Sequence, residues 1–152
     1  MTEYRVIIPD EKPRIVEFLQ EHLPGIAYVN RSLLDFEPKE VFSWHLSVMI
    51  DIEDTIENGM PSKTERELLH EFDDLLDANI KGPDLQKPNA LFLARITWNK
   101  TRELIWRVFD PEIANSYLQQ IISDDSSIRQ FDYRIDPDPN WKLTEWHLSE
   151  IK

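Results

Sequence analysis

The order of hydrophobic and polar positions predicts strands and helices in a fixed succession. Two segments rich in branched and aromatic residues, Ala90–Trp98 and Arg102–Phe109, flank a short turn at Asn99 and Lys100, which predicts a β-hairpin. An amphipathic helix is expected on each side of this hairpin, with a further strand beyond each helix. The predicted order is therefore strand, helix, strand, strand, helix, strand.

The first strand of this series is expected within Val41–Ile52, where apolar and polar positions alternate as on a half-buried strand. The helix that follows is expected to begin at Thr64, with Glu67 reaching back in a capping box, and to end at Gly82. Its apolar stripe consists of Leu68, Leu69, Phe72, Leu75, Leu76 and Ile80, which leaves its acids, Glu71, Asp73, Asp74 and Asp77, mainly toward solvent.

The second helix is expected to begin at Asp110, which can cap it, with Pro111 in its first turn. A last strand is predicted over Ile128–Ile135, followed by an extended segment over Trp141–Leu148.

The N-terminal part is expected to add a short strand at Tyr4–Ile8 and a helix that Asp10 caps and Pro24 ends. A strand within Ile26–Phe36 is then expected to pair antiparallel with Val41–Ile52.

Together these elements predict an α+β fold, a ferredoxin-like βαββαβ plait with an antiparallel sheet and an additional N-terminal strand and helix. We expect a single domain over residues 1–152. It would consist of an N-terminal helix and strand extension (1–42), the ferredoxin-like core (43–136) and an extended C-terminal tail (137–152).

A two-residue turn in the hairpin places Thr97 opposite Arg102, Arg95 opposite Leu104 and Leu93 opposite Trp106. Both faces of the hairpin then carry apolar residues. The two helices can cover one face, so the other needs cover from the N-terminal segment, from the tail after Trp141 or from a second subunit.

The charge of the chain changes which partners are expected. Of 152 residues, 29 are Asp or Glu and 17 are Lys or Arg, a formal net charge of -12 that opposes binding to a phosphate backbone. A protein partner is expected instead, either a second copy of the chain or a protein with a basic surface. No apolar run is long enough to span a membrane and the start lacks the pattern of a secretory signal, so a cytoplasmic protein is expected.

Arginine and threonine side chains near the hairpin turn are the candidate ligand site. Arg95, Thr97 and Arg102 share one face in the predicted register, and Trp98 or Trp106 could form a wall. Guanidinium groups beside a hydroxyl can bind a carboxylate or phosphate. The alternative is that these arginines pair with Glu103 or with acids of a neighbouring element.

Other chemistry finds no support in the residue pattern. The four histidines, His22, His45, His70 and His147, have no identifiable set of further metal ligands, so no metal is predicted. No serine lies in a Gly-x-Ser-x-Gly turn, there is no cysteine, and three glycines cannot form a phosphate-binding loop. No cofactor and no catalytic residue are predicted.

Scattered landmarks resemble a bacterial family, domain of unknown function 695. They are Phe42 to Asp51, Asn58-Gly59-Met60-Pro61 with Thr64-Glu65, Ala94-Arg95-Ile96-Thr97 with Arg102-Glu103, and Tyr133-Arg134-Ile135 before Asp138 and Trp141. The resemblance covers the chain from about Pro24 onward and implies no established activity or site. In plait architecture and acidity the chain is also distantly similar to the regulator of ribonuclease activity B family.

Two functions remain open from the sequence. The first is a non-catalytic, acidic protein-interaction or regulatory module. The second is a small-anion-binding domain or cryptic enzyme that uses Arg95, Thr97, Arg102 and Trp106.

Overall fold

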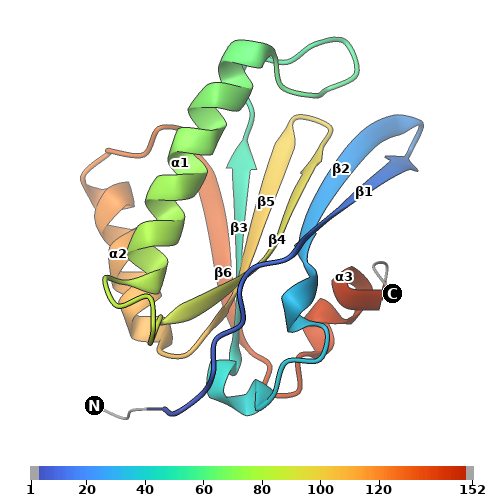
Figure 1. Ribbon diagram of the computed structural model, residues 1–152. Coiled ribbons are helices and arrows are strands. Elements are labelled where there is room, and N and C mark those ends of the chain that lie inside the picture. Colours follow the sequence, from blue (N-terminus) through green and yellow to red (C-terminus); the bar gives the residue numbers. More distant parts are fainter. Residues whose placement is uncertain (1–3, 150–152) are drawn as a thin grey trace.

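The computed structural model describes residues 4–149 as one antiparallel sheet with helices on both of its sides (Figure 1). The six strands are β1 (Pro13–Gln20), β2 (Leu23–Asn30), β3 (Trp44–Asp51), β4 (Ala90–Trp98), β5 (Thr101–Val108) and β6 (Phe131–Pro137). The helices are α1 (Lys63–Lys81), α2 (Pro111–Ser123) and α3 (Glu145–Ser149), with 3₁₀ turns at Arg31–Leu33, Lys39–Phe42 and Lys142–Thr144. The α+β class is confirmed.

The strands follow the order β1-β2-β4-β5-β3-β6, and each pairs antiparallel with its neighbours. Helices α1 and α2 lie on one face of the sheet, whereas the N-terminal segment and α3 lie on the other (Figure 1). Each face therefore has its own core.

The first core lies between the sheet and the two long helices. Its buried residues include Leu46, Val48 and Ile50 of β3, together with Leu69, Phe72, Leu76 and Ile80 of α1 and Leu118 of α2. The alternation predicted for β3 and the apolar positions at the centre of the α1 stripe are confirmed, although Leu75 remains exposed.

The second core covers the opposite face of the sheet. Tyr4, Phe36 and Phe42 from the N-terminal part and Trp141 and Leu148 from the C-terminal part pack there against Leu93, Ile105 and other sheet residues. The prediction that this face needs cover is confirmed, and both the N-terminal segment and the tail supply it.

The predicted N-terminal helix is wrong, because Pro13–Gln20 forms strand β1. Val16 and Phe18 alternate with outward residues and pack on the second core, so a period of two prevails over the helical spacing. Glu21 and His22 both have positive φ and form the two-residue turn to β2, a geometry typical of hairpins. Residues Tyr4–Ile8, predicted as a strand, contain none.

The pairing predicted for Ile26–Phe36 with Val41–Ile52 is also wrong. Strand β2 ends at Asn30 and pairs with β1 and β4, and β3 pairs with β5 and β6. The hairpin partner of β2 therefore precedes it in the chain.

The central hairpin turns at Asn99 and Lys100 as predicted, with φ of 42° and 65°. Thr97 opposes Arg102, and Arg95 opposes Leu104. A bulge between Phe92 and Ala94 then shifts the register, so that Phe92 rather than Leu93 opposes Trp106. The extra residue turns Leu91 and Leu93 toward the second core and Phe92 toward the first. Strict alternation of side chains along a strand does not predict this change, because it assumes that no residue is inserted.

The C-terminal tail is not extended as predicted, since it forms a 3₁₀ turn and α3; residues 150–152 of it lie outside the described residues. The Asp138 carboxylate accepts hydrogen bonds from the amides of Lys142 and Leu143 at 3.0 and 2.9 Å. The fully buried Arg107 of β5 donates to the same carboxylate at 2.9 Å and lies 4.9 Å from the Trp141 ring centroid. This buried ion pair holds the tail against the sheet.

Candidate functional site

The arginines predicted to bind a ligand lie beneath helix α1. Nη1 of Arg95 and Nη2 of Arg102 lie 3.5 and 3.6 Å from Oδ2 of Asp73, which α1 contributes. This is the alternative of pairing with an acid of a neighbouring element. Arg102 is 4% exposed and Asp73 is 8% exposed, so this pair is buried, and Asp73 does not face solvent as its helix pattern had suggested.

Burial dominates the electrostatics of this cluster. It raises the pKa of Asp73 to about 6, although Arg102 and Arg95 oppose the rise, and it lowers the pKa of Arg102 to about 10 despite Asp73. Both carboxylate oxygens of Asp73, and Nε and Nη1 of Arg102, lack a hydrogen-bond partner among the described residues. The ion pairs are too long to serve as normal hydrogen bonds. The cluster therefore retains polar atoms that could bind a further group.

The other two predicted site residues lie close by. Thr97 is buried and pairs with Arg102 across the hairpin. Trp106 is fully buried in the first core, where its Nε1 donates to Oδ1 of Asp77 at 2.8 Å. Trp106 is thus a core residue under α1 and forms no wall of an open pocket.

A line of polar residues continues along α1 from this cluster. Asp77, four residues after Asp73, pairs with Lys81 at 3.0 Å, and Lys81 also reaches Glu11 of the N-terminal segment at 3.1 Å. Burial lowers the pKa of Lys81, but its two acidic partners together raise it above the ordinary value. The Arg95 guanidinium lies 5.2 Å from the ring centroid of Tyr28 on β2.

The sheet face beside this line is not covered by α1 or α2. Ile15 pairs with Tyr28 and Tyr28 with Arg95, so these side chains share the face on which Arg95 meets α1. The same face includes Leu19 and Ile26. Ile15, Leu19 and Ile26 are 55%, 76% and 40% exposed. We name the space between α1 and these residues of the β1–β2 hairpin the α1–hairpin groove.

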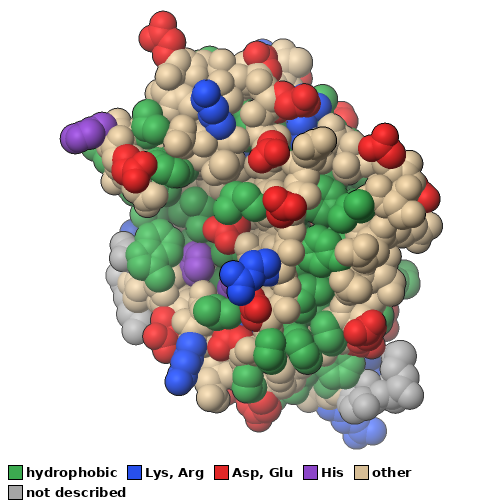
Figure 2. Space-filling model, turned by 180° about the vertical axis from the view of Figure 1, so that it is seen from behind, with side chains coloured by type: hydrophobic (Ala, Val, Ile, Leu, Met, Phe, Trp, Pro, Cys, Tyr) green, Lys and Arg blue, Asp and Glu red, His purple; other side chains and the backbone are tan. Residues whose placement is uncertain are grey.

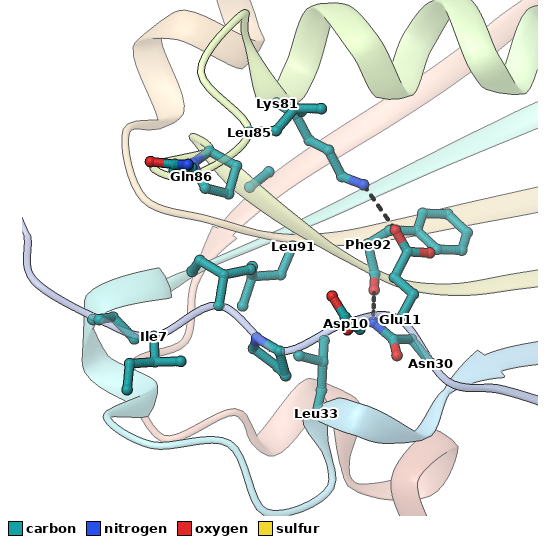
Figure 3. Close-up of a pocket in the computed structure, with 15 residues that line it drawn as sticks. Ile7, Asp10, Glu11, Asn30, Leu33, Lys81, Leu85, Gln86, Leu91 and Phe92 are labelled. Atoms are coloured by element: carbon teal, nitrogen blue, oxygen red, sulfur yellow. Dashed lines mark hydrogen bonds and ion pairs between the residues drawn. The ribbon is translucent and has the colours of Figure 1, made fainter.

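A hollow lies near each end of this groove. Near the hairpin turn, one of about 600 Å³ is lined by Leu19, Ile26 and Met60 among others. Near the C-terminal end of α1, one of about 480 Å³ is lined by the N-terminal segment, the loop after α1 and the start of β4 (Figure 3).

In the second hollow, the polar groups are engaged with one another. The ion pair of Lys81 with Glu11 lies beside it, and Asn30 donates to the carbonyl of Phe92 at 3.0 Å (Figure 3). Leu33, Leu85 and Leu91 contribute apolar lining. This hollow could therefore accept an apolar side chain, with charged groups of the protein at the rim of the hollow.

A scan of known protein families matches residues 18–146 to a family of unknown function, DUF695. The chain is a DUF695 protein. The matched region of this DUF695 protein runs from β1 to α3 and includes all four predicted ligand residues. No curated protein and no solved structure matched the chain.

Within residues 4–149 of this DUF695 protein, no group of three or more His, Asp or Glu side chains is arranged to hold a metal ion. His70 Nδ1 lies 3.9 Å from Asp73 Oδ2, and burial together with Arg102 and Arg95 lowers the pKa of His70. No helix in the described part of the chain is long and apolar enough to cross a membrane.

Sequence reasoning missed the residues that partner the predicted site. Asp73, Asp77 and Lys81 are four residues apart on α1, beside its apolar stripe, and this spacing is the signal that could have placed them on one side of the helix. Tyr28 and Glu11 offered no such signal, because they reach the site through the β1–β2 hairpin, which the pattern did not predict.

Proposed function

We propose that this DUF695 protein is a non-catalytic, acidic protein-interaction module and that the α1–hairpin groove receives a segment of a basic partner protein. The observation that carries the proposal is the row of exposed apolar residues, Ile15, Leu19 and Ile26, on a sheet face beside an acidic helix. Exposed apolar surface bordered by charge is typical of protein-binding sites.

Charge favours a basic partner over a second copy of the chain. The formal net charge is -12. Glu17 and Glu11 line the hollows at the two ends of the groove, and Asp77 lies on its α1 side, where Lys81 pairs with both Glu11 and Asp77. Two such chains repel each other, whereas a basic protein is attracted and its approach is steered. In a partner segment that is apolar and flanked by Lys or Arg, the apolar residues would contact the exposed apolar residues of the groove, and the basic residues would pair with the acids beside it.

We further propose a ferredoxin-like plait for β3 through β6. Support comes from the spatial order β4-β5-β3-β6, from the two crossovers through α1 and α2, and from the antiparallel pairing. A regulatory role and a cytoplasmic bacterial location remain predictions.

The test is affinity capture from an extract of the cells that make the protein, comparing wild type with Leu19→Glu/Ile26→Glu. Both replaced residues are exposed, so the variant should fold while losing apolar contact in the groove. The matched control is Ile113→Glu/Ile122→Glu, which adds the same charge to exposed positions of α2. We expect a basic protein to be retained by wild type and control and lost from the groove variant.

Two results would overturn the proposal. One is capture that is equal for all three proteins, because the groove would then contribute nothing. The other is a chain that captures no specific protein and has the mass of a monomer by light scattering.

A second function, small-anion binding, is supported by Nε and Nη1 of Arg102, which have no hydrogen-bond partner within residues 4–149. An entering carboxylate or phosphate would compete with Asp73 for Arg95 and Arg102. Thermal shift measurements with phosphate and a series of small carboxylates should then show stabilisation that Arg95→Gln removes. A flat response of the wild type would exclude this function.

A further inference from the structure

A separate hollow lies on the sheet face opposite α1. It has a volume of about 530 Å³ and is formed by three parts of the chain. Phe18 and Gln20 of β1 form one side, Trp146 and His147 of α3 form another, and the floor consists of sheet residues, Met49, Ile96, Trp98, Thr101 and Glu103. Figure 2 shows, on this side of the molecule, a histidine with hydrophobic side chains to one side of it and charged side chains to the other.

Two indole rings border the hollow, and one of them is fixed in place. Trp98 Nε1 donates to the backbone carbonyl of Gln20 at 3.1 Å, which holds its ring between β4 and β1. Trp146 is 51% exposed, and its ring packs edge-on against His147 with centroids 5.2 Å apart. Two tryptophans in the lining of one hollow supply aromatic surface that can attract a cation.

The formal charge of the hollow comes from one carboxylate. Among its described lining residues, Glu103 is the one carboxylate and no Lys or Arg is present. One oxygen of Glu103, Oε2, accepts from the Ser47 hydroxyl at 2.5 Å, so the carboxylate is oriented by β3. Nδ1 of His147 is buried and has no hydrogen-bond partner within the described chain. Burial lowers the pKa of His147, although Glu103 and the backbone of Thr144 oppose this shift.

We propose that this hollow binds a primary alkylammonium group, the chemistry of a lysine side chain or of a free alkylamine. The aromatic rings and Met49 would surround the methylene chain, and Glu103 would neutralise the charge. The N–H groups would donate to Glu103, and a quaternary ammonium has no N–H to donate, so the site should prefer a primary amine. This site lies on the other side of the sheet from the α1–hairpin groove and is independent of it.

The test is a titration of the wild-type protein with n-butylammonium at pH 7.5, followed by the NMR signals of the indole N–H groups. Signals of Trp98 and Trp146 should shift and saturate, while those of the buried Trp106 and Trp141 should not. Glu103→Gln should weaken binding by about tenfold, the loss expected for a hydrogen bond to a charged group. The matched control Glu112→Gln, at an exposed position of α2, should bind as wild type does.

Further ligands distinguish the two sources of the amine. A lysine peptide that binds at least about tenfold more tightly than n-butylammonium assigns the site to a protein ligand, and equal affinity assigns it to a free amine. Trp146→Leu, at a half-exposed position, should weaken either ligand and covers the case in which Glu103→Gln fails to fold. The proposal is overturned if no Trp signal saturates, if neither variant weakens binding, or if tetramethylammonium binds as tightly as n-butylammonium.

Discussion

At the scale of single residues, burial sets the charge states that most affect stability. His45 on β3 is buried and lies 3.2 Å from Arg107 through Nδ1. Burial, Arg107 and His147 lower its pKa from 6.5 to about 4. Between pH 6.5 and 4, His45 is therefore protonated in the unfolded chain but not in the folded protein. The free energy of unfolding should fall as the pH drops through this range.

We predict that His45→Asn, which retains an acceptor for Arg107, reduces this pH dependence. Between pH 6.5 and 4 the wild type should lose about 3 kcal/mol of unfolding free energy more than the variant, at about 1.36 kcal/mol for each pH unit between the two pKa values. Urea denaturation of both proteins at pH 7 and pH 4 measures this difference. Equal losses for the two proteins would show that His45 titrates normally in the folded state.

The cluster of Asp73, Arg95 and Arg102 makes a second prediction at this scale. Arg102→Met should cost about 3–5 kcal/mol, because it leaves the Asp73 carboxylate buried with Arg95 as its remaining arginine partner. The double variant Asp73→Leu/Arg102→Met should be more stable than this single variant, since no buried charge of the pair remains. Denaturation curves of the three proteins decide this, and costs that simply add would contradict the coupling.

Sequence reasoning at the residue scale reached part of this site. It placed Arg95, Thr97 and Arg102 on one face, because the hairpin turn and the spacing of two fix that relation locally. It could not identify Asp73 as the partner, since which acid of α1 meets the arginines depends on how the helix lies across the sheet. It also missed the bulge between Phe92 and Ala94, which places the side chains of Leu91, Phe92 and Leu93 on the faces of the sheet opposite to those predicted.

At the scale of elements, the start of α1 supplies a direct test of helix capping. The side chain of Ser62 accepts from the amide of Glu65 at 3.2 Å, so the N-cap is Ser62, two residues before the predicted cap Thr64, and the helix begins at Lys63. The Glu65 carboxylate pairs with Arg129 at 2.6 Å. It also accepts a hydrogen bond from the amide of Glu53, which fixes the loop before the helix. The capping box of Thr64 with Glu67 is therefore wrong.

We predict that Ser62→Ala costs about 1 kcal/mol of stability, as loss of an N-cap does, and that Thr64→Ala costs less than about 0.5 kcal/mol. Thermal unfolding of the two variants compares them directly. A larger cost for Thr64→Ala would mean that the helix begins where its sequence pattern first suggested.

Elements whose ends carry local signals were predicted well, and those that depend on distant partners were not. Asp110 caps α2 with Pro111 in its first turn, as expected from sequence alone. Strand β1 was mistaken for a helix because Ile15, Phe18, Leu19 and His22 happen to follow helical spacing, while its pairing with β2 rests on a turn of Glu21 and His22 that lacks the usual Asn-Gly. The tail depends on Arg107, which lies more than thirty positions earlier in the sequence.

At the scale of the whole molecule, the two faces of the sheet are covered by different parts of the chain. The two long helices cover β6, β3, β5 and part of β4 on one face and leave the β1–β2 hairpin uncovered, whereas the N-terminal segment and the C-terminal tail cover most of the other face (Figure 1). This asymmetry creates the α1–hairpin groove. The sequence pattern did not predict this groove, because it results from two extra strands at one edge of the sheet that no long helix within residues 4–149 covers.

The central claim is that the groove contacts a basic protein, and photo-crosslinking from within it tests this most directly. A photoreactive amino acid would replace Leu19 in the groove and, in a matched control, Ile122 on α2, and both proteins would be irradiated in the cells that make them. We predict a crosslinked basic protein from position 19 and none from position 122. The claim is contradicted if position 19 gives no adduct, or if both positions give the same one.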